Sequence, residues 1–149
     1  MILLQSMQIK IKRVDASQPL PQYHTGGSAG FDLYSREDAL IPAKSLALLP
    51  SNFIICTPPG YVLILAARSS LAKKKGLQLA NGIGVIDSDY CGAEDEIKLL
   101  LHNFTDNEVK VERGERLAQG LFIRVEQGQW EEVNEINNKT RGGFGSTGI

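Results

Sequence analysis

Short apolar stretches separated by turn-forming residues constrain this 149-residue chain more than any other feature. Strands are favoured where apolar residues alternate or cluster over a few positions between Gly, Pro, Asn, Asp and Ser. Such stretches recur roughly every 8–12 residues, the spacing typical of an all-β sandwich or barrel. They occupy residues 7–14, 52–57, 61–67, 96–104, 108–114, 116–125 and 130–133.

Turn chemistry adds two local expectations. Pro58, Pro59 and Gly60 lie between 52–57 and 61–67, which predicts a hairpin. The segment "SSLAKKKG" (69–76) favours one short helix, with a serine available as the N-cap and a glycine as the stop.

The hydrophobic pattern stops after Val133. We expect residues 1–133 to form a β-domain and residues 134–149 to form a flexible glycine-rich arm, because the last segment has too little apolar surface to order itself.

Charge and cysteine content limit the function classes. The net charge of −1 gives no reason to expect binding to nucleic acid. No stretch approaches the ~20 apolar residues that a membrane span needs. Two cysteines, Cys56 and Cys91, are too few for a disulfide framework, so we expect reduced thiols in a cytoplasmic protein.

One segment suggests a buried carboxylate, and another suggests an anion site. "GGSAGFDLYS" (26–35) crowds small residues around Asp32, which suits one buried carboxylate or, equally, an ordinary turn. "RSSLA" (68–72) places an arginine and two hydroxyls where a strand meets a helix, and helix starts favour anions. A plain serine N-cap is the ordinary alternative.

The segment "NGIGVIDSDYCG" (81–92) has features of a catalytic turn. Gly82 and Gly84 permit a tight hairpin whose backbone can approach a ligand. Asp87 follows two apolar residues, a position where a carboxylate can be partly desolvated and act as a general base. Asp89 is a weaker rival, since it reads as a turn residue, and a turn rich in Asp and Ser is the simpler interpretation.

Several chemistries are disfavoured. "GFGSTG" lacks the lysine of a P-loop. His24 and His102 are the only histidines, and the signature of zinc deaminases is absent. We expect both histidines to be structural.

Five segments together resemble the trimeric dUTP diphosphatase (dUTPase) family: "AGFDLYS", "RSSLA", "GVIDSDYCG", "GERLAQ" and "RGGFGSTG", in this order across residues 29–148. One such motif would be weak evidence, whereas five in register are specific. The resemblance implies a jelly-roll-like β-fold and a homotrimer in which the arm of one chain closes a site formed by the others. It also implies hydrolysis of dUTP to dUMP and pyrophosphate with Mg²⁺, which limits uracil in DNA and supplies dUMP for dTMP synthesis.

The resemblance assigns roles to the residues of the third motif. Asp87 matches the carboxylate that deprotonates the water attacking the α-phosphorus. Tyr90 matches the ring that packs on deoxyribose and excludes a 2′-hydroxyl. The uracil edge is read by Asn81 and by the backbone of Gly84, Val85 and Ile86.

The other motifs supply the phosphate contacts. The matching residues are Arg68, Ser69, Ser70 and Gln119, with Asp32 and Arg116 as supporting polar residues. In the arm, Phe144 matches the aromatic that stacks on uracil, and Arg141, Gly145, Ser146 and Thr147 match the grip on the γ-phosphate. Mg²⁺ binds mainly through phosphates and waters, so no dedicated metal cage is expected.

The chain departs from the family pattern in two places. Three extra residues, Ala93–Asp95, follow Gly92. With this insertion, the family's next uracil-facing backbone position matches Lys98. Arg141 precedes Phe144 by three residues, two fewer than in many members. Two alternatives stay open: a dCTP deaminase that shares the fold, and a catalytically weak regulatory protein that uses the nucleotide as a switch.

Overall fold

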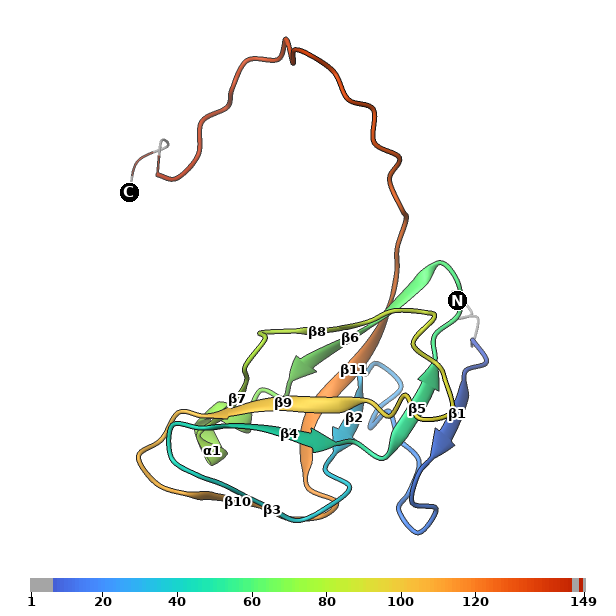
Figure 1. Ribbon diagram of the computed structural model, residues 1–149, viewed down its shortest axis with the longest axis vertical. Helices are drawn as coiled ribbons and strands as arrows, with labels where there is room; N and C mark the ends of the chain where they lie inside the picture. Colours follow the sequence, from blue (N-terminus) through green and yellow to red (C-terminus); the bar gives the residue numbers. More distant parts are fainter. Residues whose placement is uncertain (1–6, 146–147, 149) are drawn as a thin grey trace.

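The computed structural model describes residues 7–145 and 148. In this part of the chain, strands and one short helix follow in the order shown in Figure 1, which confirms the all-β class. The elements are β1 (Lys10–Arg13), β2 (Phe31–Tyr34), β3 (Ala39–Ile41), β4 (Leu46–Pro50), β5 (Phe53–Cys56), β6 (Tyr61–Ala67), α1 (Leu71–Lys75), β7 (Leu77–Leu79), β8 (Gly84–Ile86), β9 (Lys98–Asn103), β10 (Val109–Val111) and β11 (Arg116–Arg124). No described helix has the length and hydropathy to cross a membrane.

Two antiparallel sheets enclose the core. One has the strand order β2-β11-β6-β8 and the other β4-β9-β7, while β1 pairs with β5 and β10 with β3. Alternation along β9 buries Leu99, Leu101 and Asn103 and turns the intervening residues outward, as the two-residue period of a strand requires. Leu63 and Leu65 of β6 join the same core cluster, so the two sheets share one hydrophobic interior.

The hairpin expected between β5 and β6 is wrong. β5 pairs with β1, whereas β6 pairs with β11 over seven consecutive positions, from Tyr61↔Arg124 to Ala67↔Ala118, and with β8 on its other edge. Both edges of β6 are therefore occupied. The turn at Gly60, with φ 81°, passes the chain from one pair of strands to another sheet.

The expected short helix is confirmed as α1. Leu71 is buried and anchors it, and Ser70 occupies the N-cap position without a side-chain cap hydrogen bond. Gly76 ends the helix in the left-handed conformation, with φ 67°, and donates its N–H to the Ala72 carbonyl. A Cβ at Gly76 would also lie 2.1 Å from the Thr105 methyl group, so both backbone and space require glycine here.

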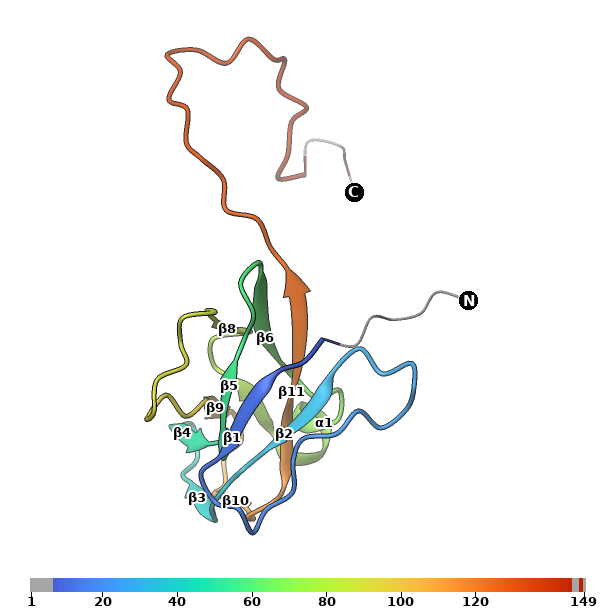
Figure 2. The ribbon, with the colours of Figure 1, turned by 90° about the vertical axis from the view of Figure 1, so that its right-hand side faces the viewer.

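The strand expected over residues 130–133 is wrong. The last strand, β11, ends at Arg124, and Trp130 is 99% exposed. Within the described part of the chain, residues 130–133 belong to none of the sheets. Residues 126–145 are all exposed, and they project from the β-body as an extended segment (Figures 1 and 2).

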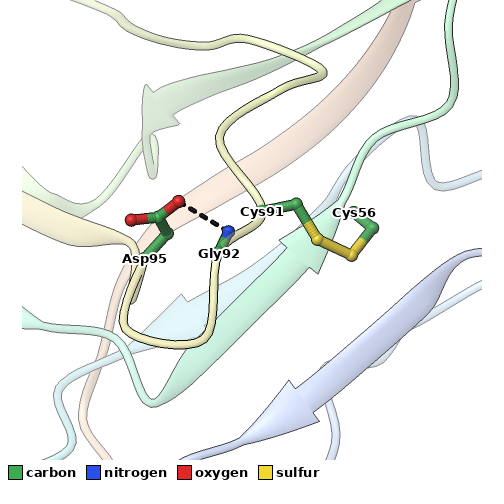
Figure 3. Close-up of a disulfide and its surroundings, with 4 residues drawn as sticks. All are labelled: Cys56, Cys91, Gly92 and Asp95. Carbon is green, nitrogen blue, oxygen red and sulfur yellow. Dashed lines mark hydrogen bonds between the residues drawn. A yellow bond between two sulfur atoms is a disulfide. The ribbon is translucent and has the colours of Figure 1, made fainter.

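The expectation of two reduced thiols is also wrong. Cys56, the last residue of β5, and Cys91, in the loop after β8, form a disulfide (Figure 3). Their Cα atoms are 5.1 Å apart, within the range usual for disulfides. The fold brings together two cysteines that are 35 residues apart, a proximity with no local signal in the sequence.

Candidate active site

A cluster of two arginines and one carboxylate lies where β6 ends and β11 begins. Asp32 Oδ1 is 3.1 Å from Arg68 Nε, and Asp32 Oδ2 is 3.1 Å from Arg116 NH1. The Asp32 side chain is only 14% exposed, so its charge is held against both guanidinium groups. Two cations share one anion, which leaves the cluster positive and suited to binding phosphate.

Strand register brings the other expected phosphate-binding residues to this cluster. Gln119 of β11 lies opposite Asp32 of β2 on one side and opposite Ala66 of β6 on the other. Its side-chain amide donates to the Ala67 carbonyl at 3.1 Å, which fixes it beside Arg68. Ser69 and Ser70 continue directly from Arg68 into α1, so six motif residues from three segments of the chain lie here.

His24 belongs to this cluster, although its expected role was only structural. Its Nε2 atom lies 2.5 Å from Asp32 Oδ2 and 2.8 Å from Arg116 NH1. His24 lies in the segment "YHTGG", shortly before the strand that contains Asp32. Arg116, in contrast, is 92 residues away from His24 in the sequence. Nothing in the local sequence pattern predicts their contact.

A second group of expected site residues lines a pocket between β8 and β9. The pocket has a volume of about 110 Å³, and its lining includes Asn81, Gly84, Val85, Ile86 and Lys98. β8 is an edge strand of its sheet, and among the described residues it pairs with β6 alone. An edge strand leaves part of its N–H and C=O groups without strand partners, so β8 offers backbone donors and acceptors to a ligand in this pocket.

The two glycines of this segment have different tasks. Gly82 makes the turn, with φ 73°. Gly84 allows close packing, because a Cβ there would lie 3.0 Å from three side-chain atoms of Leu65. The expected hairpin is not a paired one: β7 pairs with β9 and β8 with β6, so the turn joins two different sheets.

Asp87 follows β8 directly and begins an irregular loop. The Tyr90 N–H donates to the Asp87 carbonyl at 3.1 Å, and the Cys91 N–H donates to Asp89 at 3.0 Å. Asp87 is exposed, so the partial desolvation expected of a general base is absent in the single chain. The Tyr90 ring is 39% exposed, and its hydroxyl lies 3.4 Å from the Glu96 carbonyl.

The cationic cluster and the Asp87 loop lie at opposite ends of β6. Ile86 pairs with Leu63, whereas Arg68 follows the far end of the strand at Ala67. At about 3.3 Å per residue, Asp87 and Arg68 of one chain are separated by roughly 20 Å. Figure 1 shows the same arrangement, with α1 on one side of the body and the loop after β8 on the other. One chain therefore does not bring the two groups together.

The described arm residues do not pack against the β-sheets. Arg141, Phe144 and Gly145 are exposed, and Phe144 has no covering surface at all. Ser146 and Thr147 lie outside the described residues.

The donor set suits a metal ion held chiefly by a ligand. Among residues 7–145 and 148, no three His, Cys, Asp or Glu side chains gather as a metal cage. Asp32 is already shared by two arginines. Mg²⁺ usually retains several waters and binds substrate phosphates, so this arrangement is compatible with an ion that arrives with a nucleotide.

A base-sized pocket lined by edge-strand backbone, an adjacent carboxylate and a separate cationic cluster define an all-β nucleotide-binding protein. The chain belongs to the dUTPase family, whose model matches residues 16–148.

Known relatives agree with this assignment. The chain is 36% identical over 145 residues to deoxyuridine 5'-triphosphate nucleotidohydrolase from Helicobacter pylori strain 26695, covering 96% of this chain and 98% of the relative. It is 38% identical over 147 residues to the enzyme of the same name from Zymomonas mobilis, covering 96% and 99%. The crystal structure of dUTPase from Streptococcus mutans superposes with a TM-score of 0.74 at 34% identity, over 80% of this chain and 98% of that one.

Proposed function

We propose that the protein hydrolyses dUTP to dUMP and pyrophosphate with Mg²⁺. The observation that carries this proposal is the pocket between β8 and β9, because the five residues expected to face the uracil edge line it and Asp87 follows β8 directly. The names of the relatives, which are nucleotidohydrolases of deoxyuridine triphosphate, support the same reaction.

Specificity arises from the main chain of β8. Uracil lies in the pocket, with its polar edge toward the open edge of Gly84–Ile86 and the amide of Asn81. A narrow pocket formed by backbone leaves little space for a 5-methyl group. The Tyr90 ring follows in the next turn and packs on deoxyribose, where a 2′-hydroxyl would clash with it.

The chemical step uses Asp87 as general base. Its carboxylate accepts a proton from a water molecule, the water oxygen bonds to the α-phosphorus, and the bond from that phosphorus to the pyrophosphate oxygen breaks. Arg68, Ser69, Ser70 and Gln119 bind the phosphates, with Asp32 and Arg116 supporting Arg68 in the cationic cluster. Mg²⁺ would be held mainly by phosphate oxygens and waters, and it would supply positive charge to the leaving group.

A homotrimer supplies the complete site. Asp87 and Arg68 of one chain are separated by roughly 20 Å, whereas Asp87 of one copy can meet Arg68 of another. Burial between subunits would also desolvate Asp87, which is exposed in the single chain. The cytoplasmic setting stays a prediction.

The arm, residues 134–149, closes the site of a neighbouring subunit. Ordering such a segment costs roughly 1–2 kcal/mol per residue, so stacking of Phe144 and phosphate contacts from Arg141 and its neighbours must offset that cost. Closure therefore requires a full triphosphate, and it excludes water from the site.

The direct test is pyrophosphate release from dUTP, dTTP, dCTP and UTP with Mg²⁺. We expect rapid release from dUTP alone, and no ammonia from dCTP. Comparable rates with UTP or dTTP would contradict the proposed reading of ribose and base, and ammonia from dCTP would favour a deaminase.

A further inference from the structure

The disulfide between Cys56 and Cys91 joins the Asp87 loop to the core (Figure 3). Cys91 directly follows Tyr90 and lies four residues after Asp87. Consecutive Cα atoms are fixed about 3.8 Å apart, so a shift of Cys91 is transmitted to Tyr90 through the chain.

The two ends of this disulfide differ in rigidity. On one side, β5 pairs with β1 along its whole length, and Phe53 and Ile55 are 0% and 1% exposed. On the other side, residues 87–90 are exposed and belong to no strand. The disulfide thus connects a firmly packed strand to a segment that the sheets do not hold.

Hydrogen bonds within the loop do not replace this connection. Those that the structure describes for residues 87–95 have both partners within 87–96. The Gly92 N–H, for example, donates to Asp95 Oδ2 at 2.6 Å and closes a turn inside the Ala93–Asp95 insertion. Such bonds shape the loop, but they do not fix its position relative to β5. Core contact resumes at Glu96 and Ile97, after the insertion.

We propose that the Cys56–Cys91 disulfide is a positioning element for Tyr90 and Asp87, and that its reduction by a dithiol lowers dUTP hydrolysis. This inference rests on the proposed function. A thiolate of the dithiol attacks one cystine sulfur, the Cys56–Cys91 bond breaks, and the other cysteine leaves as a thiolate. The second thiolate of the reagent then attacks the reagent sulfur of the mixed disulfide, so that bond breaks and the second cysteine is released. The protein gains two electrons and two protons as two thiols, and the dithiol becomes a disulfide.

The disulfide is accessible to such a reagent. Both cysteines are half-buried, and a hollow of about 250 Å³ lies beside them, lined in part by Lys10, Lys12 and Ala93. Exposed lysines favour the approach of an anionic thiolate. Access and local positive charge are the features that make disulfide exchange fast.

The experiment compares oxidised and dithiothreitol-reduced full-length protein, with the thiol count of each sample established by alkylation and mass spectrometry. We expect reduction to lower kcat/KM for dUTP by about 3- to 100-fold, since a misplacement of about 1 Å can cost about 10²-fold. The ratio of kcat/KM for dUTP to kcat/KM for UTP should also fall in the reduced sample, because Tyr90 faces the ribose. Reoxidation should restore both values.

Serine variants separate this role from general damage. Cys56→Ser, Cys91→Ser and the double variant each remove the same disulfide. All three should therefore lower kcat/KM for dUTP by the same factor, and dithiothreitol should change none of them further. The double variant is the matched control for effects of the reductant on Mg²⁺ or on other residues. Circular dichroism and light scattering verify that each variant is folded and assembled.

Three outcomes overturn the proposal. Equal kcat/KM and equal dUTP/UTP discrimination in oxidised and reduced protein would remove the positioning role while leaving the enzyme assignment intact. Two free thiols that resist oxidation by diamide would remove the disulfide itself. No pyrophosphate release from dUTP in either state would overturn the proposed function and this inference together.

Discussion

Arg36 binds Glu96 through two parallel hydrogen bonds, from Nε to Oε1 at 2.8 Å and from NH2 to Oε2 at 3.1 Å, although 60 residues separate them. Glu96 Oε1 also accepts the N–H of Asn52 at 2.8 Å. Asn52 is fully buried and has φ 77°, a backbone conformation that needs support from its surroundings. Glu96 therefore anchors the chain to the core at the point where the Asp87 loop ends.

Replacing Glu96 by alanine should destabilise the fold. The change leaves Arg36 unpaired and the Asn52 N–H without its acceptor, and we expect the free energy of unfolding to fall by about 2–3 kcal/mol, less than for a fully buried pair because Arg36 is partly exposed. Urea denaturation measures the loss. Glu94→Ala, at an exposed position two residues earlier, is the control and should change stability by less than about 0.5 kcal/mol.

Asp87→Asn should separate binding from chemistry. The amide keeps the shape of the side chain but cannot accept a proton from water, so kcat should fall at least ~10²-fold. Calorimetry with a non-hydrolysable dUTP analogue should show retained binding. Asp89→Asn tests the neighbouring carboxylate and should have a much smaller effect; the reverse ranking would transfer the role to Asp89.

Asp32→Asn should loosen the phosphate-binding cluster. Without the carboxylate charge, Arg68 and Arg116 repel each other, and we expect KM for dUTP to rise about 10-fold. Steady-state kinetics provides the measurement. Asp106→Asn removes a carboxylate that is 89% exposed and paired with Lys44, so it should leave KM unchanged. An unaltered KM in the Asp32 variant would argue against this cluster as the phosphate site.

Removing residues 140–149 should leave the fold and assembly intact, because the described part of this segment is exposed and adds nothing to the core. Activity should fall about 10-fold or more, since Phe144 and the phosphate contacts are lost. Light scattering reports assembly and pyrophosphate release reports activity. Full activity in the shortened protein would refute closure by the arm.

Acid should weaken one long-range link. Hydrogen bonds from Ser17, and then from Arg113, hold the pKa of the Asp15 carboxyl well below its usual range. Because the folded-state pKa is depressed, this group stabilises the fold above the unfolded pKa of about 3.9, and the contribution is lost as pH falls from there. The difference in urea midpoint between wild type and Asp15→Asn should be present near neutral pH and shrink below pH about 4. A pH-independent difference would contradict this linkage.

The sequence predicts features that depend on near neighbours. The alternation of apolar and polar residues around Ile9 and Ile11 predicts β1, and Gly76 predicts the end of α1. Asn81, Gly84–Ile86 and Lys98 also line one pocket, and their contact with uracil stays a prediction. In each case the signal lies within one short segment or in a recognisable set of segments.

Features that depend on distant partners were missed. The pairing of β5 with β1 rather than β6, the Cys56–Cys91 disulfide and the contact between His24 and Arg116 all join segments whose proximity is decided by the packed sheets. Exposure of Asp87 was missed for a related reason: two apolar residues before it do not reveal that the chain leaves β8 for an exposed loop at that point.

The position of Asp87 and Arg68 at opposite ends of β6 has a genetic consequence. If each site takes these two residues from different copies, a protein lacking Asp87 and a protein lacking Arg68 are both inactive alone, yet mixed assemblies contain some sites with both residues intact. Two defective alleles in one cell would then complement each other, and the recovered activity would report how many sites each mixed assembly rebuilds.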